Sequence, residues 1–514
     1  MSFRSRPEGA NPSIGSDARW RSTRVGVLGC GLIALAPFAV DASAQTAAPA
    51  SAAAAATSAA SAPTTVAPAP QPLAAPVAGR SEASPELDYR LPALEIIGFD
   101  FLLNRANRYF GTDRDHYAVN GSTIARNLRS GWGTDRDTFQ VNQLGHPYQG
   151  SMYHGFARST GFDYWHSLGY AFAGSIAWEI AGESTRPSRN DQVASGIGGT
   201  FLGEALFRMS NLVLEHSGGL PYFWREIAAA AISPPTGFNR LAFGDRYRSI
   251  FSSRDAAYFS RLELGYAGTV KRDLGSSTAD FKRNEAQAHF SIDYGLPGSP
   301  GYEYTRPFDF FNFQATATTA NIVENVLTHG LLVGRSYDAG PNYRGVWGLY
   351  GSYDYIAPQT YRISTTAVSL GSTAQWWLGE SLSLQGTAMA GLGYAAVGTT
   401  RSSSNERDYN YGVAPQALLA LRLTHGDKTA LDVALREYFV SSLASGTTGG
   451  RDNIVRGDVS LTYRIDKQQA VTLRVLGNRR DATFASSDTR QSRVTVGIFY
   501  TLLGQDRFGT VDWR

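Results

Sequence analysis

Long segments in which apolar and polar residues alternate constrain the fold of this chain more than any other feature. Between Glu285 and Tyr294, and again between Arg456 and Ile465, apolar residues or glycine occupy every second position and polar residues the positions between. Alternation with a period of two predicts β-strands that have one apolar face and one hydrated face.

About twelve such segments follow one another in the C-terminal half of the chain. They lie at residues 257–270, 282–295, 307–320, 323–338, 343–357, 362–379, 382–398, 410–426, 429–442, 453–466, 470–483 and 491–504. Most are far longer than the roughly 5 to 6 residues common in globular proteins, and long enough for the roughly 9 to 11 residues of a bilayer crossing. The sequence therefore predicts a membrane β-barrel of about 12 antiparallel strands within residues 251–514.

The connections between these segments are a second test of the barrel prediction. Even-to-odd joins include short ones at 379–380, 425–428 and 467–469, whereas odd-to-even joins at 271–281, 399–409, 443–452 and 484–490 are longer and polar. Outer-membrane barrels have short periplasmic turns and longer external loops, so both ends of the barrel are expected in the periplasm. The joins after the third and fifth segments are shorter than this rule predicts. No segment after residue 44 has the uncharged apolar length of a membrane helix.

The N-terminus resembles an export signal. Arginines precede an apolar stretch from Val25 to Val40, and residues 42–44 read Ala-Ser-Ala, so residues 1–44 are predicted to be a cleaved signal peptide. The alternative is a retained inner-membrane anchor, for which the apolar stretch is short. Residues 45–86 are rich in Ala and Pro and predict a disordered linker. Together with the barrel, these features predict a protein of the cell outer membrane of a Gram-negative bacterium.

The last predicted strand carries a pattern related to barrel assembly. Thr495-x-Gly497-x-x-Tyr500-x-Leu502 resembles the signal by which the barrel-assembly machinery recognises outer-membrane proteins, although Gly504 to Arg514 follow it here. The resemblance implies this machinery as a partner during biogenesis.

Residues 87–250 differ in texture from the barrel segments. Three helices are predicted, at Asp163–Ala181, Asn190–Glu215 and Tyr222–Ser233, and the second contains Gly196, Gly199 and Gly203. Glycine weakens an isolated helix, so its expected use here is close approach between helix backbones. We expect a helical element that packs against the barrel mouth or is inserted as a plug.

This region also resembles a known family. The similarity is carried by His146-Pro147-Tyr148-x-Gly150-x-x-Tyr153, Ala157-Arg158-x-x-Gly161, Ser175-x-x-Trp178-Glu179, Glu183, Pro187-Ser188-x-x-Asp191 and Gly203-Glu204. In their order these motifs are similar to a bacterial envelope family known as domain of unknown function 3943, over roughly residues 90 to 210. The resemblance implies a location in the envelope and no established activity.

The same segment concentrates ionisable residues, which are the candidate site. They are His146, His154, His166, Glu179, Glu183, Asp191 and Glu204. Glu179 and Glu183 lie one helical turn apart, where mutual repulsion could raise one pKa. Functional interpretations are a lipid hydrolase or acyltransferase site and a divalent-cation site; the structural one is pairing with Arg158, Arg189 and Arg208. Regular metal-ligand spacings are absent, so neither a metal nor a cofactor is predicted.

The sequence leaves the molecular role open. It has no Gly-x-Ser-x-Gly or Walker-type loop, and the barrel histidines His289 and His329 are weak candidates for a lipid-hydrolase site. A net charge of +3 without a basic run excludes nucleic acid as an expected partner. Three hypotheses remain: a plugged or narrow barrel with a structural or small-solute transport role, an envelope enzyme acting on lipid or lipopolysaccharide, and a periplasmic interaction module anchored by the barrel. Outer-membrane lipid is a partner in each.

Overall fold

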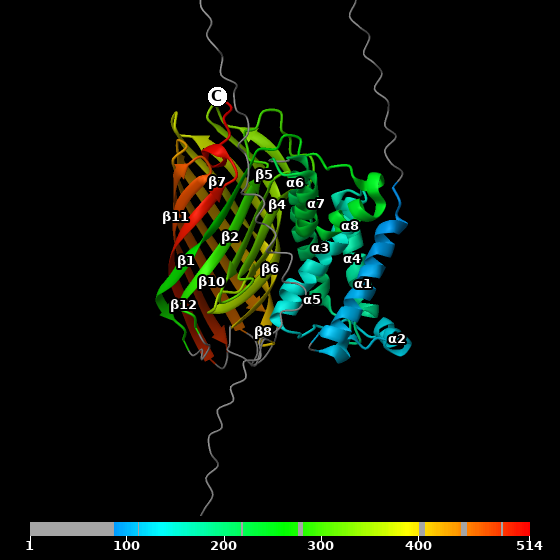
Figure 1. The fold of residues 1–514 in the computed structure, drawn as a ribbon. Helices are drawn as coiled ribbons and strands as arrows, with labels where there is room; N and C mark the ends of the chain where they lie inside the picture. Colours follow the sequence, from blue (N-terminus) through cyan, green and yellow to red (C-terminus); the bar gives the residue numbers. More distant parts are fainter. Residues whose placement is uncertain are drawn as a thin grey trace, which may run out of the picture.

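The computed structural model describes residues 87–111, 113–216, 219–275, 281–399, 407–443, 450–484 and 487–514 (Figure 1). The predicted signal peptide and linker lie outside the described residues. The α-helices are α1 (Arg90–Phe110), α2 (Gly121–Arg129), α3 (His146–Ser159), α4 (Tyr164–Ala181), α5 (Arg189–Asp191), α6 (Gly199–Glu215), α7 (Tyr222–Ile232) and α8 (Pro234–Phe243). Short 3-10 segments η3 (Arg114–Tyr117) and η6 (Gly244–Tyr247) and π-helical segments η4 (Val141–Gly145) and η5 (Gln192–Gly198) complete this helical domain. None of the helices described combines the length and the apolar character needed to cross a membrane.

The remaining chain forms a closed barrel of twelve strands, as the alternation predicts. The strands are β1 (Tyr258–Asp273), β2 (Asn284–Tyr294), β3 (Phe311–Thr318), β4 (Asn325–Asp338), β5 (Tyr343–Ile356), β6 (Tyr361–Trp377), β7 (Leu382–Thr399), β8 (Tyr409–His425), β9 (Thr429–Ser442), β10 (Gly450–Asp466), β11 (Gln469–Phe484) and β12 (Ser487–Leu503). Each strand pairs antiparallel with its neighbours in sequence, and β1 closes the ring by pairing with β12, with Arg261 opposite Leu503.

Connection lengths distinguish the two ends of the barrel. At the end we name the short-turn end, the joins after β4, β6, β8 and β10 are brief, at 339–342, 378–381, 426–428 and 467–468. At the opposite, long-loop end, the joins after β1, β7 and β9 are longer, whereas those after β3, β5 and β11 are short. The predicted segment 307–320 was too long, since β3 covers only Phe311–Thr318, and the predicted long loop at 484–490 was wrong, since β11 ends at Phe484 and β12 begins at Ser487. The short-turn end also has one long connection, residues 295–310 between β2 and β3.

Inward-facing side chains of the strands fill the lumen, where an apolar cluster that includes Ile356, Tyr361 and Ile454 lies beside paired charged residues. Arg422 of β8 lies 3.1 Å from Asp293 of β2 and 2.7 Å from Asp432 of β9. Because β2 and β8 are not neighbours in the barrel order, the Arg422–Asp293 pair spans the interior. The chain after β12 also enters the lumen, where Gln375 donates a 2.6 Å hydrogen bond to the carbonyl of Val511. The lumen is therefore occupied by strand side chains and by the C-terminal segment.

The helical domain packs against the outer wall of the barrel. On β2, Phe290 and Ile292 alternate with the inward-facing residues, and these outward side chains share one hydrophobic core with Phe201 and Leu206 of α6. Figure 1 shows the helices gathered beside the wall, with α6 alongside β4 and β5. Packing against the barrel was predicted, but placement at the mouth or as a plug was wrong. The aromatic outer faces of β2 and β3 match the apolar face of α6, and the lumen is already filled by strand side chains.

Glycines allow the helices to approach closely, as their spacing predicts. A Cβ on Gly150 of α3 would lie 1.9 Å from the carbonyl oxygen of Ser195, and one on Gly199 would lie 2.7 Å from the Cα of Gly150. Any larger residue at these positions would force the two backbones apart. The close packing of α3 on η5 and α6 sets the positions of the ionisable side chains on these helices.

Candidate functional site

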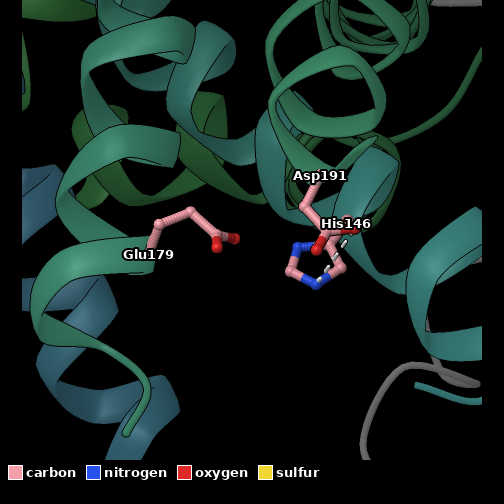
Figure 2. Close-up of side chains that lie close together, drawn as sticks. All are labelled: His146, Glu179 and Asp191. Atoms are coloured by element: carbon pink, nitrogen blue, oxygen red, sulfur yellow. Dashed lines mark ion pairs between the residues drawn. The ribbon is translucent and has the colours of Figure 1, made fainter. Parts of the chain in front are cut away.

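Three of the predicted ionisable residues meet at the long-loop end of the helical domain (Figure 2). His146 lies at the first position of α3, Glu179 lies near the end of α4, and Asp191 lies on α5. Ser188 caps α5 by accepting a 3.3 Å hydrogen bond from the backbone N–H of Asp191, and this bond holds the short helix in place. We name His146, Glu179 and Asp191 the acidic cluster.

The acidic cluster is compact and buried. Its three residues are at most 5% exposed. His146 Nε2 lies 3.9 Å from Asp191 Oδ1, and the candidate ligand atoms of all three side chains lie within 4.8 Å of one another. Figure 2 shows the Glu179 carboxylate entering from one helix toward His146 and Asp191 on the other side. Three side chains from separate helices therefore converge on one small volume.

Glu179 is the least satisfied member of the cluster. Its Oε2 accepts a 2.7 Å hydrogen bond from the backbone N–H of Ser188, whereas its Oε1 is buried and has no hydrogen-bond partner among the described residues. Burial, reinforced by the nearby carboxylates of Asp191 and Glu183, raises the pKa of Glu179 to about 10. A buried carboxylate without a counter-charge is costly, so this side chain must be protonated or must face a cation.

Asp191 and Glu183 have more complete hydrogen bonding. Asp191 accepts a short hydrogen bond from the Ser188 hydroxyl and a 2.9 Å bond from Asn190 Nδ2, while burial and Asp135 raise its pKa well above the ordinary value. Glu183 accepts bonds of 2.8 Å from Trp178 Nε1 and 2.9 Å from the Thr185 hydroxyl, and burial raises its pKa to about 7. Repulsion between Glu179 and Glu183 contributes, as predicted for one helical turn, but burial is the larger cause.

The donor set of the acidic cluster suits a divalent cation. Imidazole nitrogen and carboxylate oxygen are ligands for Zn²⁺, and carboxylate oxygen also suits Mn²⁺ or Mg²⁺. The sequence predicted no metal because the spacing between His146, Glu179 and Asp191 follows no ligand motif. The fold supplies the proximity that the spacing lacks.

The same residues are arranged less well for nucleophilic chemistry. Ser195 Oγ lies 3.4 Å from His146 Nδ1, and Asp191 approaches the other ring nitrogen at 3.9 Å. Ser195, His146 and Asp191 thus follow one another as the nucleophile, base and acid of a catalytic triad would. However, Ser195 is 1% exposed, and the distance between His146 and Asp191 exceeds that of a hydrogen bond. A substrate could not reach this serine without opening the helical domain.

The other predicted residues lie elsewhere. His154 and Glu204 meet at 3.0 Å toward the short-turn end, where Arg158 and Arg208 lie 2.7 and 2.8 Å from Glu204. The predicted structural pairing of carboxylate with these two arginines is therefore confirmed. His166 is at the surface and pairs with Asp163, 2.9 Å away. Arg189, a third predicted partner, is exposed.

The barrel histidines face the interior and not the bilayer. His289 contacts the Thr316 hydroxyl at 2.9 Å across the β2–β3 pair and lines a lumenal cavity with Arg261. His329 lines a small lumenal cavity with Asp354.

Two contributors to the acidic cluster were not predicted. Asp135 lies close enough to raise the pKa of Asp191. Tyr411, on the outer face of β8, accepts a 2.7 Å hydrogen bond from Asn190, which in turn donates to Asp191. Tyr411 lies 220 positions after Asp191 in the chain, so only the docking of the helices on the barrel reveals its role.

Comparison with known proteins agrees with the resemblance seen in the motifs. Residues 131–235 match the family described as domain of unknown function 3943. This interval begins and ends later than the predicted one and contains every motif from His146 to Glu204. No curated protein matches the chain.

Solved structures resemble the barrel only distantly. A NanC porin matches at 8% identity over 46% of this chain and 98% of its own, with a TM-score of 0.24. The outer membrane channel DcaP of Acinetobacter baumannii matches at 7% identity over 48% and 97%, also with a TM-score of 0.24. A KdgM porin in complex with oligogalacturonate matches at 11% identity over 47% and 98%, with a TM-score of 0.21. These scores carry no argument about function, and the fold rests on the strand pairing itself.

Proposed function

We propose that this chain, in which a stretch matching domain of unknown function 3943 precedes a closed barrel, is an outer-membrane protein whose sealed barrel anchors and scaffolds the helical domain. The observation that carries the proposal is the ion pairing across the lumen, which joins opposite walls. A transport role would require those pairs and the C-terminal segment to move aside.

The exposed surface of the barrel supports the outer-membrane location. Large apolar side chains are exposed on the parts of the strands that the helical domain leaves uncovered, among them Leu264, Leu370, Leu461 and Ile498. A water-soluble protein rarely exposes so many apolar residues, whereas a barrel in a membrane presents them to lipid. The expected signal peptide and the assembly pattern at the last strand agree with this location.

The interior supports a sealed barrel. Arg261 lies 2.8 Å from Asp432, Arg474 lies 2.8 Å from Glu263, and Arg422 joins the first pair through its contact with Asp432. The cavity between them has a volume of about 110 Å³. A twelve-strand barrel is also narrower than the 16- to 18-stranded porins that leave an aqueous channel.

Planar-bilayer recordings test the scaffold proposal. We expect the purified wild-type protein to insert without conductance steps, and a double variant Asp293→Ala, Arg422→Ala to show small steps because the pair across the lumen is removed. Heat-modifiable electrophoretic migration verifies folding of both proteins, and fractionation of the native membrane tests the location. Stable, solute-permeable channels formed by the wild type would overturn the sealed barrel.

A specific observation favours a second function within the helical domain, the binding of a divalent cation by the acidic cluster. The Glu179 carboxylate faces His146 and Asp191 (Figure 2), and its Oε1 has no hydrogen-bond partner among the described residues. A cation there would supply the counter-charge that this carboxylate lacks. The envelope-enzyme hypothesis has no comparable support, because Ser195 is buried.

Calorimetric titration of chelator-treated protein with Zn²⁺, Mn²⁺ and Mg²⁺ tests cation binding. We expect one site per chain for at least one of these ions, and loss of that site in His146→Ala and Asp191→Asn. The matched control is His166→Ala, because His166 is an exposed histidine of the same domain and should leave binding unchanged. Undiminished binding by His146→Ala would show that the ion binds elsewhere.

A further inference from the structure

A cavity of about 520 Å³ lies at the short-turn end of the helical domain, opposite the acidic cluster. Its wall is formed by the turn between α3 and α4, by α6, by residues 246–251 after α8, and by residues 305–307 of the long β2–β3 connection. Arg158, Arg208, Arg246 and Arg306 all line it. The one long join at the short-turn end is therefore used to complete this cavity.

Buried carboxylates organise the arginines beside the cavity. Glu204 is fully buried and pairs with Arg158 and Arg208. Asp309, also fully buried, lies 3.1 Å from Arg208 and is the shared partner of Arg254 and Arg306. We name these four arginines the arginine cluster: Arg158, Arg208, Arg254 and Arg306.

The arginine cluster has more positive charge than its partners neutralise. Four guanidinium groups share two carboxylates, an excess of two positive charges. Arg158 and Arg208 are 6% and 3% exposed and are matched by Glu204 and Asp309, whereas the side chains of Arg254 and Arg306 are 36% and 29% exposed, so the excess charge belongs to the partly exposed arginines. Burial and the neighbouring Arg208 and Arg254 lower the pKa of Arg306, in agreement with repulsion inside the cluster. An anion in the cavity would remove this repulsion.

Aromatic and apolar groups occur beside the same arginines. The ring of Phe251 lies under three guanidinium groups, with its centroid 4.3 Å from Arg306, 4.7 Å from Arg158 and 5.1 Å from Arg208. On the cavity wall, Trp165 and Ile250 are 51% and 41% exposed. The cavity is therefore cationic within and apolar at its exposed wall.

Apolar residues are also exposed on α1, next to whose first residue Tyr89 packs on Phe162 of the cavity wall, with ring centroids 4.9 Å apart. The exposed side of α1 carries Leu94, Ile97, Phe101 and Leu102, each more than 60% exposed. Such a surface is typical of contact with lipid or another apolar partner, and it lies on a domain that is docked on the outer wall of a barrel. A free phosphate ion would use the arginines but not this surface.

We infer that the cavity binds the phosphate group of an anionic lipid, with the phosphate facing Arg158, Arg208 and Arg306 and the acyl chains passing Trp165 and Ile250 onto the apolar outer surface. Guanidinium groups bind phosphate through paired N–H donors, which fits a site with several arginines. This inference concerns the opposite end of the helical domain from the acidic cluster and does not depend on cation binding there.

Native mass spectrometry of the full chain released from nanodiscs tests the inference. The nanodiscs contain equal amounts of phosphatidylglycerol and phosphatidylcholine, and we expect the wild type to retain phosphatidylglycerol at least 10-fold more than phosphatidylcholine. Arg306→Ala and Arg246→Ala should each reduce this preference several-fold. Arg248→Ala is the matched control, because Arg248 is an exposed arginine of the same region that pairs with Asp245 and does not line the cavity.

Further measurements separate the alternatives. Because Arg306 contacts the buried Asp309, folding of its variant is verified by heat-modifiable migration, and Arg246→Ala, with a half-exposed side chain, is the variant whose folding is least affected. Equal retention of both lipids, or the same loss in Arg248→Ala as in Arg306→Ala, would overturn the headgroup site. Thermal stabilisation by inorganic phosphate equal to that by phosphatidylglycerol would overturn lipid as the source of the anion.

Discussion

The helical domain has a buried ionisable cluster at each end, and the two clusters differ in the sign of the charge left unbalanced. At the long-loop end, Glu179 and Asp191 face one histidine and no arginine within pairing distance in the described residues. At the short-turn end, Glu204 is shared by Arg158 and Arg208. A buried glutamate therefore lies among other carboxylates at one end of the domain and among arginines at the other.

The two glutamates show the difference most directly. Burial acts to raise both pKa values, and it raises that of Glu179 to about 10 because the neighbours are carboxylates. At Glu204 burial is outweighed by Arg158, His154 and Arg208, which hold the pKa well below the ordinary value. Substituting each glutamate by the isosteric glutamine should therefore have opposite consequences.

The largest expected effect is from Glu204→Gln. Loss of this carboxylate leaves two buried arginines without their shared partner, and we expect a loss of about 3 to 5 kcal/mol in the free energy of unfolding. Urea unfolding in detergent micelles, followed by tryptophan fluorescence, measures it. The control is Asp245→Asn, whose side chain is 96% exposed and pairs with the half-exposed Arg248, where about 0 to 1 kcal/mol is expected.

The same variant should change the pH dependence of stability. Because the folded pKa of Glu204 is depressed, its contribution is present above the ordinary pKa of 4.5 and is lost as the pH falls through that value toward the folded pKa. We expect the free energy of unfolding of Glu204→Gln to fall less steeply than that of the wild type as the pH decreases. A fall as steep as that of the wild type, or a stability within 1 kcal/mol of it, would contradict the ion-pair account.

Glu179→Gln should have a smaller effect on the free energy of unfolding, and that effect should depend on whether Zn²⁺ is present. In chelator the wild-type carboxyl is protonated at neutral pH, so glutamine replaces a neutral group and the free energy of unfolding should change by less than about 1 kcal/mol. With Zn²⁺ at about 100 times its Kd, the wild type should gain about 2.7 kcal/mol and the variant nothing. A large loss in chelator would mean that Glu179 is ionised and paired without a cation.

Packing between the two clusters is tested by Gly150→Ala. A Cβ at this position meets the Ser195 carbonyl at 1.9 Å, so α3 must move from η5, and we expect a loss of about 1 to 3 kcal/mol together with weaker cation binding. The control is Gly98→Ala on α1, where a Cβ has no neighbour within 4 Å and helix propensity should raise stability by up to about 1 kcal/mol. Equal effects of the two substitutions would show that the close approach is not required.

The sequence predicted the barrel better than the helical domain, for a physical reason. Alternation is a local property of a strand, so β9 was predicted at its observed bounds, 429–442. The helix α1, in which Ile96 is buried while Leu94, Ile97 and Phe101 are exposed, was not predicted. The segment predicted as one helix from Asn190 to Glu215 is divided into α5, the π-helical η5 and α6.

The sequence identified the residues of the candidate site but not which of them lie together. All three members of the acidic cluster were among the seven candidates, but His146 and Asp191 lie on different helices, and their proximity depends on α3 packing against η5. The placement of the domain on the outer wall could not be predicted either. Outward aromatic residues such as Phe290 and Phe313 have the same pattern whether they contact lipid or a helix.

The smallest expected effect tests whether the barrel positions the acidic cluster. Tyr411 of β8 accepts a hydrogen bond from Asn190, which donates 2.9 Å to Asp191 Oδ1, so the barrel wall orients a cation ligand through one intermediate side chain. Tyr411→Phe should reduce stability by about 1 kcal/mol and weaken Zn²⁺ binding several-fold by calorimetry. Tyr394→Phe is the control, because Tyr394 stacks on Tyr411 at 5.4 Å and its hydroxyl has no hydrogen bond among the described residues. If both variants bind Zn²⁺ like the wild type, the barrel does not orient the residues of the acidic cluster, and its role is only to anchor the helical domain.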